Sequence, residues 1–283
     1  MTWNGAVLYK STDGTTYEKL LSTTTGAIIG QATTLLDDFD GGNVFDYENT
    51  VTVSLQTTGE LVSYTELQVL NGSGAFALGA HGRWEIVQYK TATLDSPGVY
   101  TLSGLLRGRR GTEWAQSTHV TGDKFVLLTT SSLQRPNPGT SEIGLSRYFK
   151  GVTFGDTINN TSPQTFTNSA VGLKPYAPVQ LTGSRDGSNN LTINWIRRAR
   201  LGGEWRDYVD IGIGEATLSF DVEVWDATYS TLIRTIAGVN NVTTSYTAAE
   251  QTSDGLTPGD TIYLKIYQIS ATVGRGYALT GSV

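Results

Sequence analysis

The chain has 283 residues, a formal net charge of −6, no cysteine and only two histidines. At roughly 100 to 200 residues per domain this length predicts about two domains, and the inventory excludes thiolate metal sites, thiol catalysis and multi-histidine metal centres. Charged residues make up only 16% and there are 33 glycines, which favours extended structure over helix.

The charge balance and the apolar runs also limit the partners. A specific nucleic-acid partner is not expected, because that role needs a basic face. No run approaches the about 18 apolar residues of a membrane-spanning helix, and Met1 to Gly5 lack the pattern of a secretory signal. We therefore expect synthesis in a cytoplasm, no membrane insertion and no bound cofactor.

Short apolar runs separated by turn dipeptides mark residues 1–130. Val51, Val53 and Leu55 share one face of an alternating run, which is typical of a half-buried strand. Further strands are predicted over residues 6–9, 67–70, 84–89, 99–102 and 125–128. Residues 111–117 predict a single helical turn. Many short strands with turns between them predict a β-rich domain that is either a barrel or a sandwich.

Residues 131–174 change in composition to Pro, Asn, Ser, Thr and Gly. We predict an irregular connector here, with room for one or two short strands because Val152 and Phe154 alternate. Lys174-Pro175 and Ala177-Pro178 then bias the backbone toward an extended form, as at the start of a new domain.

Alternating strand patterns resume after Pro178 and predict a second β domain over residues 175–283. The alternating sets are Leu191, Ile193 and Trp195, then Phe220, Val222 and Val224, then Ile262, Leu264 and Ile266. The span of about 105 residues suits a seven-stranded sandwich.

The order of features in this second domain is similar to that of fibronectin type III domains. Pro178, Trp195 and Phe220-Asp221-Val222 are followed by the string LTPGDTIY, which ends at Tyr263. The resemblance implies an all-β chain with a fibronectin type III-like sandwich at its C-terminal end. It also implies a tyrosine corner, in which the Tyr263 hydroxyl bonds backbone upstream.

Three further segments resemble one family over nearly the whole chain. They are the run from Trp3 to Gly14, the string LLRGRRGTE from Leu105 to Glu113 with His119 and Gly122-Asp123 after it, and the run from Gln268 to Gly276. The family is the large hub, or "host specificity", protein at the tail tip of siphovirus-like particles and gene transfer agents. There, such segments end a longer polypeptide, so a split gene, a fragment and an accessory subunit all remain open.

This resemblance implies a structural virion protein of a tail tip or baseplate hub, located at the virion tail tip, which contributes to tail assembly and host attachment. It implies a homotrimer around the tail axis, with other tail-tip, hub and distal tail subunits as partners. A host surface receptor or glycan is a further expected partner. No catalytic activity is expected.

Two charged segments are candidate interface or ligand loops. Arg107, Arg109 and Arg110 lie among glycines, and we expect them to pair with Glu113 or with a neighbouring subunit, or else to bind a ligand. The second segment contributes Arg197, Arg198, Trp205 and Arg206, which alternate with acidic residues in a solvated or interfacial loop.

Three alternatives stay open. Asp37, Asp38 and Asp40 offer oxygen ligands for Ca²⁺, although a solvated turn is the default. A glycan-binding adhesin would stack sugars on Trp114, Trp205 or Trp225. A polysaccharide hydrolase would use Asp37, Asp38 or Glu113. His81 and His119 have no nucleophile signature nearby and are interpreted as non-catalytic.

Overall fold

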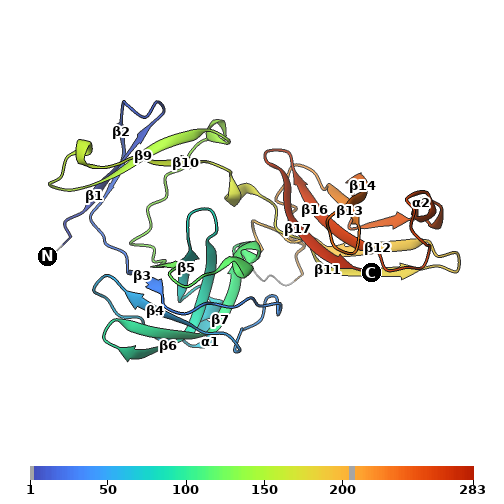
Figure 1. Ribbon diagram of the computed structural model, residues 1–283, viewed down its shortest axis with the longest axis horizontal. Coiled ribbons are helices and arrows are strands. Elements are labelled where there is room, and N and C mark those ends of the chain that lie inside the picture. Colours follow the sequence, from blue (N-terminus) through green and yellow to red (C-terminus); the bar gives the residue numbers. More distant parts are fainter. Residues whose placement is uncertain (1–2, 204–207) are drawn as a thin grey trace. The chain divides into compact units, whose positions relative to one another are not determined.

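The computed structural model describes residues 3–203 and 208–283. The chain is all-β apart from short helical segments, and it divides into two compact units, Met1–Ser169 and Ala170–Val283 (Figure 1). The boundary falls before the expected start of the second domain at residue 175, because Ala170 and the turn η4 (Val171–Leu173) already belong to the second unit.

The first unit contains a closed barrel with the strand order β3-β4-β7-β6-β5-β8. Its strands are β3 (Ile29–Ala32), β4 (Val51–Leu55), β5 (Ala75–Gly79), β6 (Glu85–Ser96), β7 (Val99–Arg109) and β8 (Lys124–Leu127). Val51 and Val53 point into the core as the alternation predicts, beside Phe76, Tyr89 and Phe125. Of the two architectures expected from the sequence, the structure is the barrel.

The strand predicted over residues 67–70 is wrong. The structure has a helix there, α1 (Glu66–Leu70), which Thr65 begins with a capping box closed by Gln68. Val69 is buried, whereas Leu67 and Leu70 are exposed. The cap hydrogen bonds therefore decided the local structure, and the apolar content of the run did not.

The helical turn predicted over residues 111–117 is confirmed as a short 3-10 helix, η1 (Glu113–Thr118). Further 3-10 turns are η2 (Thr140–Glu142) and η3 (Ile158–Asn160).

The remaining strands of the first unit form a separate four-stranded antiparallel sheet with the order β10-β9-β1-β2. They are β1 (Ala6–Ser11), β2 (Glu18–Thr23), β9 (Ser146–Thr153) and β10 (Gln164–Thr167). The segment expected to be a connector thus contains two strands, and one of them, β9, pairs with the start of the chain, with Val7 opposite Val152. The barrel is inserted between β2 and β9, and its first and last strands are paired, with Ile29 opposite Val126.

The second unit is a sandwich of a three-stranded and a four-stranded sheet, with the orders β11-β12-β15 and β14-β13-β16-β17. Its elements are β11 (Val179–Arg185), β12 (Leu191–Ile196), β13 (Phe220–Trp225), β14 (Leu232–Val239), β15 (Thr243–Tyr246), α2 (Ala248–Ser253), β16 (Tyr263–Ser270) and β17 (Gly274–Ser282). The three alternating sets predicted from the sequence all lie in its core. The seven-stranded, fibronectin type III-like sandwich is confirmed.

The tyrosine corner expected at Tyr263 is not formed in the described part of the chain. Burial alternates along β16, so Ile262 and Leu264 point into the core and Tyr263 points outward, where its ring contacts Tyr229. The connection from β15 to β16 is held instead by Tyr246, whose hydroxyl donates to Asp254 Oδ2 at 2.6 Å. Gln251 adds a hydrogen bond to the Tyr246 carbonyl at 2.8 Å.

No helix within residues 3–203 or 208–283 has the length and apolar character needed to cross a bilayer.

Candidate functional site

A β-bulge near the end of β7 shapes the segment around Arg107. The register between β6 and β7 shifts between Ile86 and Gln88, and Gly108 adopts a left-handed backbone with φ of 58°. A Cβ atom on Gly108 would come within 2.6 Å of Glu113 Cγ, so only glycine fits. The bulge leaves Arg107 pointing into the protein.

Arg107 is fully enclosed and is held by two carboxylates. Its Nε and one terminal nitrogen donate to Glu85 at 2.9 and 3.0 Å, which is the forked geometry of strong arginine pairs. Its other terminal nitrogen reaches the Asp37 carbonyl at 2.9 Å and Asp46 Oδ2 at 3.3 Å. Both partner carboxyl groups are as buried as the guanidinium. Arg107 therefore ties the loop that contains Asp37 and Asp46 to the wall of the barrel.

His119 extends this network on the other side of Glu85. Its Nε2 lies 2.6 Å from Glu85 Oε2 and its Nδ1 lies 3.1 Å from Asp123 Oδ2. Arg83 pairs with Asp123 through both terminal nitrogens. Carboxylate oxygens accept hydrogen bonds, so each ring nitrogen of His119 faces an acceptor. The guanidinium groups of Arg83 and Arg107 pair with the carboxylates of Asp46, Glu85 and Asp123.

The pKa values follow from these contacts. Burial acts to raise the pKa of Glu85, but hydrogen bonds from His119, Arg107 and the Gly108 amide outweigh it and hold this pKa below its ordinary value. Burial likewise opposes ionisation of Asp123, and the bonds from Arg83, Val120 N and His119 lower its pKa. The cluster of Arg83, Glu85, Arg107, His119 and Asp123, with Asp46, is named here the barrel charge network.

The expectation that Arg107 pairs with Glu113 or with a neighbouring subunit, or binds a ligand, is wrong, because Arg107 is buried and bonded to Glu85 and Asp46. Arg109 is half-buried and donates to Gln88 at 3.0 Å and Asn43 at 2.7 Å. Arg110 is exposed, and a role at an interface stays a prediction for it. Glu113 is half-buried and lies over Gly108.

Sequence reasoning missed most of the barrel charge network. In the sequence, His119 and Asp123 only continue a motif, and Glu85 and Asp46 carry no signal. The one signal for a buried partner is that Arg107 directly follows Leu105 and Leu106, because an arginine next to buried apolar residues needs a carboxylate.

The charged segment after β12 lies at one end of the sandwich. Arg197 donates to the Ile211 carbonyl and, at 3.3 Å, to the Gly212 carbonyl, and it pairs with Asp210 at 3.4 Å. Arg198 stacks over the Tyr176 ring at 5.2 Å. Both arginines thus hold their own segment in place. The predicted site residues Trp205 and Arg206 lie outside the described residues.

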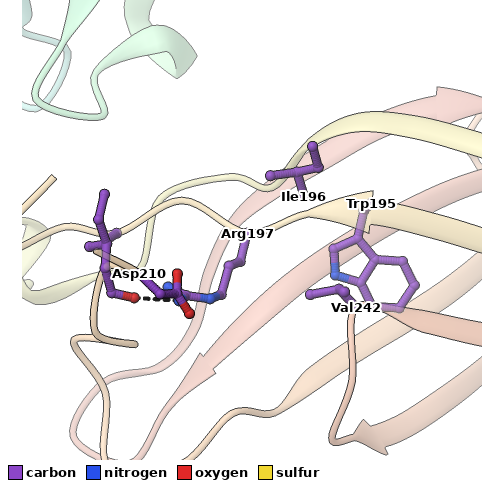
Figure 2. A pocket seen from close by; sticks show the side chains of 7 residues that line it. Trp195, Ile196, Arg197, Asp210 and Val242 are labelled. Carbon is purple, nitrogen blue, oxygen red and sulfur yellow. Dashed lines mark hydrogen bonds and ion pairs between the residues drawn. The ribbon is translucent and has the colours of Figure 1, made fainter. Parts of the chain in front are cut away.

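A cavity of about 310 Å³ opens beside this segment. It is lined by Trp195, Ile196, Arg197, Ala199, Asp210, Ile211 and Val242. Figure 2 shows the Arg197 side chain directed at Asp210 and the indole of Trp195 beside Val242. The walls are mainly apolar, and one charged pair lies among them.

The other candidates do not gather into a site. Asp37, Asp38 and Asp40 are exposed, and within the described ranges no three acidic or histidine side chains come together as metal ligands. Trp114 is partly exposed on η1. The Trp225 ring is covered by Lys265 Nζ at 4.1 Å, and its Nε1 donates to Glu223.

Fold and contacts together define an all-β protein with a closed barrel that is tied internally by charges, followed by a sandwich with a cavity at one end. The family model described as Rcc01698-like, C-terminal, matches residues 27–126. That match covers a little over a third of the chain and coincides with the barrel from β3 to β8. No curated protein matches the chain.

Three solved structures illustrate what the chain is similar to. The FN5 domain of Drosophila Lar has 11% identity and a TM-score of 0.24, over 38% of this chain and 96% of that domain. Domains d3–d4 of rat CD45 have 10% identity and a TM-score of 0.28, over 55% and 72%. The FN1–FN3 domains of chicken CNTN1 have 12% identity and a TM-score of 0.27, over 89% and 65%. At such scores, the strand pairing itself is the ground for the sandwich fold.

Proposed function

We propose that this chain is a non-enzymatic structural subunit of the tail tip or baseplate hub of a phage or phage-like particle. The proposal rests on one observation: the hub-like sequence and the family match fall on the same barrel. The most specific part of the hub resemblance, Leu105 to Glu113 with His119 and Asp123, supplies three members of the barrel charge network, and the family match covers the same barrel.

The physical design of the barrel supports an assembly role. A closed barrel has no free strand edge to aggregate. The barrel charge network anchors the loop with Asp37 and Asp46, and the turn with His119, from inside. The outer surface stays available for neighbouring subunits, including the exposed Leu67 and Leu70 of α1. A rigid scaffold with exposed loops is the usual arrangement in proteins that work through contacts.

The test is incorporation into particles. The full chain is tagged and co-expressed with the tail genes of a particle that carries it, and purified particles are analysed by quantitative mass spectrometry. The expected result is stable incorporation at three copies beside a hub protein. A chain that stays monomeric and joins no particle component would contradict the proposal.

The hydrolase alternative has its own assay. Turnover of cell-wall or capsular polysaccharide is measured with the wild-type chain and with a variant that lacks the Asp37 and Asp38 carboxylates. We expect no product above buffer in either case. Product formed by the wild type and lost in the variant would replace the structural role with an enzymatic one.

A further inference from the structure

The outer sheet of the first unit has two free edges that differ in character. Its strand order β10-β9-β1-β2 leaves β2 and β10 each paired on one side only (Figure 1). The edge at β2 is protected by the charges of Glu18 and Lys19 and by a bulge in its pairing with β1. β10 has neither feature, because its ladder with β9 is regular and all of its residues are exposed and uncharged. Of the two edges, β10 is therefore the one open to a further strand.

The uncharged character extends beyond the strand itself. Residues 157–173 contain no Asp, Glu, Lys or Arg. Natural edge strands usually carry such charges, because a free row of backbone groups pairs readily with another chain. β10 also buries none of its four side chains against the rest of the chain, so packing contributes little to holding it. The segment thus lacks the features that keep an edge unpaired, and a second strand would stabilise it.

The backbone of β10 determines which groups face the free side. On the β9 side, the Asn168 carbonyl accepts from Gly144 N at 2.8 Å. In an antiparallel pair the N–H and C=O of one residue point the same way, and successive residues alternate. Phe166 therefore faces β9 with its backbone, whereas Thr165 and Thr167 direct both of their backbone groups outward. Within residues 3–203 and 208–283, no protein group bonds these outward N–H and C=O groups.

A second copy of β10 matches these groups in one antiparallel register. With a two-fold axis at Phe166, Thr165 of each copy lies opposite Thr167 of the other, and each such pair exchanges two N–H···O bonds. Phe166 meets its own counterpart, and aromatic and threonine pairs are favourable cross-strand neighbours. Charge favours the same strip, because each copy has a net charge of −6 and an uncharged contact avoids repulsion between the copies.

We propose that two copies of this chain pair through their β10 strands, which joins their outer sheets into one. A contact of four residues a side is far smaller than the about 20 to 30 residues a side of a standard interface, so the dimer is weak and reversible. This inference goes beyond the proposed function and concerns the free chain. Three copies around one axis cannot all pair two by two, so the contact is released on incorporation into a particle.

The test follows the purified full chain, with no tail component present, as its concentration rises from micromolar to millimolar. Sedimentation equilibrium measures the average mass, and the amide signals of ¹⁵N-labelled chain are recorded over the same range. The expected result is a mass that rises toward that of two chains. The amide signals of Thr165 and Thr167 shift with it, while the Leu20 signal on β2 stays fixed.

Two variants weaken the pairing in different ways. Thr165→Pro removes an N–H that points away from β9, and proline is tolerated at such edge positions. Each copy then loses one cross-strand bond, so the dissociation constant of the dimer should rise about tenfold or more. Phe166→Lys places two lysines opposite each other, which should weaken the dimer as well. The matched control is Leu20→Lys on β2, where the side chain is similarly exposed, and it should dimerise like the wild type.

Four outcomes would overturn the proposal. They are a mass that stays that of one chain throughout, which leaves the edge to another protein or to solvent; concentration-dependent signals that lie outside β10; undiminished pairing by Thr165→Pro; and equal dimer affinity in Phe166→Lys and Leu20→Lys. Unchanged amide signals of β1 show that a variant keeps the outer sheet. Because no tail component takes part, failure here leaves the assembly role untouched.

Discussion

The two units of this chain bury charge to different extents. The barrel gathers Asp46, Glu85, Arg107, His119 and Asp123 in its interior and pairs each of them. The sandwich has an apolar core, and its buried carboxylate, Glu223, pairs with Arg275, whose side chain is 41% exposed. This contrast teaches that an enclosed network can join several segments from inside, whereas a pair that reaches the surface is weakened by solvent.

Breaking the barrel charge network should give the largest effect. Arg107→Met would leave Glu85 and Asp46 buried without their cation, and the expected loss in the free energy of unfolding is about 3 to 5 kcal/mol. Amide hydrogen exchange in increasing urea separates the two units, because only barrel amides should lose protection.

The matched control is Arg110→Met, two positions after the bulge glycine, where the side chain is exposed. It should change the free energy of unfolding by at most about 0.5 kcal/mol. Equal losses in both variants would mean that the network contributes nothing beyond surface charge.

The second-largest effect should come from low pH, which should destabilise the barrel before the sandwich. The pKa values of Glu85 and Asp123 are lowered in the folded chain, so the unfolded chain binds more protons in acid. Their contribution to stability is present above about pH 4 and is lost as the pH falls through the lowered folded values. In the sandwich, Asp254 also has a lowered pKa but lies nearer the surface.

We therefore expect barrel signals to disappear at a higher pH than sandwich signals when a ¹⁵N spectrum is followed from pH 6 downward. Simultaneous loss of both sets, or earlier loss of the sandwich, would remove the special role of the buried carboxylates. Glu85→Gln provides the control, since it should flatten the acid response of the barrel while lowering its stability at neutral pH.

The bulge at Gly108 offers a smaller perturbation. Gly108→Ala forces a Cβ atom against Glu113 and a side chain into a left-handed backbone, at a cost of about 2 kcal/mol. Gly122→Ala, in the turn before β8, is the control, because Gly122 also has a left-handed backbone, with φ of 92°, but its Cβ atom would meet nothing within 4 Å. Urea midpoints of the barrel transition compare the two, and a harmless Gly108→Ala would show that Arg107 does not depend on the bulge.

The smallest expected effect concerns the connection from β15 to β16. Tyr246→Phe removes the hydrogen bond to Asp254 and should cost about 1 kcal/mol. Tyr263→Phe should stay within about 0.5 kcal/mol, since its hydroxyl points away from the core. Thermal unfolding of the sandwich measures both losses. A larger loss in Tyr263→Phe than in Tyr246→Phe would support a tyrosine corner at Tyr263.

The strands were predictable because burial on one face imposes a period of two. The sequence itself shows which face of a strand is buried, as at Val51 and Val53 or at Ile262 and Leu264. Residues 67–70 have the same apolar content, but a cap formed by Thr65 and Gln68 made them helical. Helix capping depends on hydrogen bonds between a few neighbouring residues, and the alternation of apolar and polar residues does not report them.

The site was less predictable, since its contacts cross long stretches of chain. Arg107 meets Glu85 and Asp46, which are 22 and 61 residues away, and no spacing rule links them. Trp195 shows the same limit. Its alternation with Leu191 and Ile193 correctly places it in the core, but the atoms that its indole meets become visible only once every neighbour is known.

The insertion of the barrel between β2 and β9 has a consequence for the order of folding. Val7 must find Val152, a loop long enough to make direct closure slow. The pairing of Ile29 with Val126 brings the two ends of the barrel together, so a folded barrel leaves only the 22 positions from Val7 to Ile29 and the 26 from Val126 to Val152 to be searched. During synthesis, β1 therefore pairs with β9 only after the barrel has formed, and the outer sheet is the last part of the first unit to be completed.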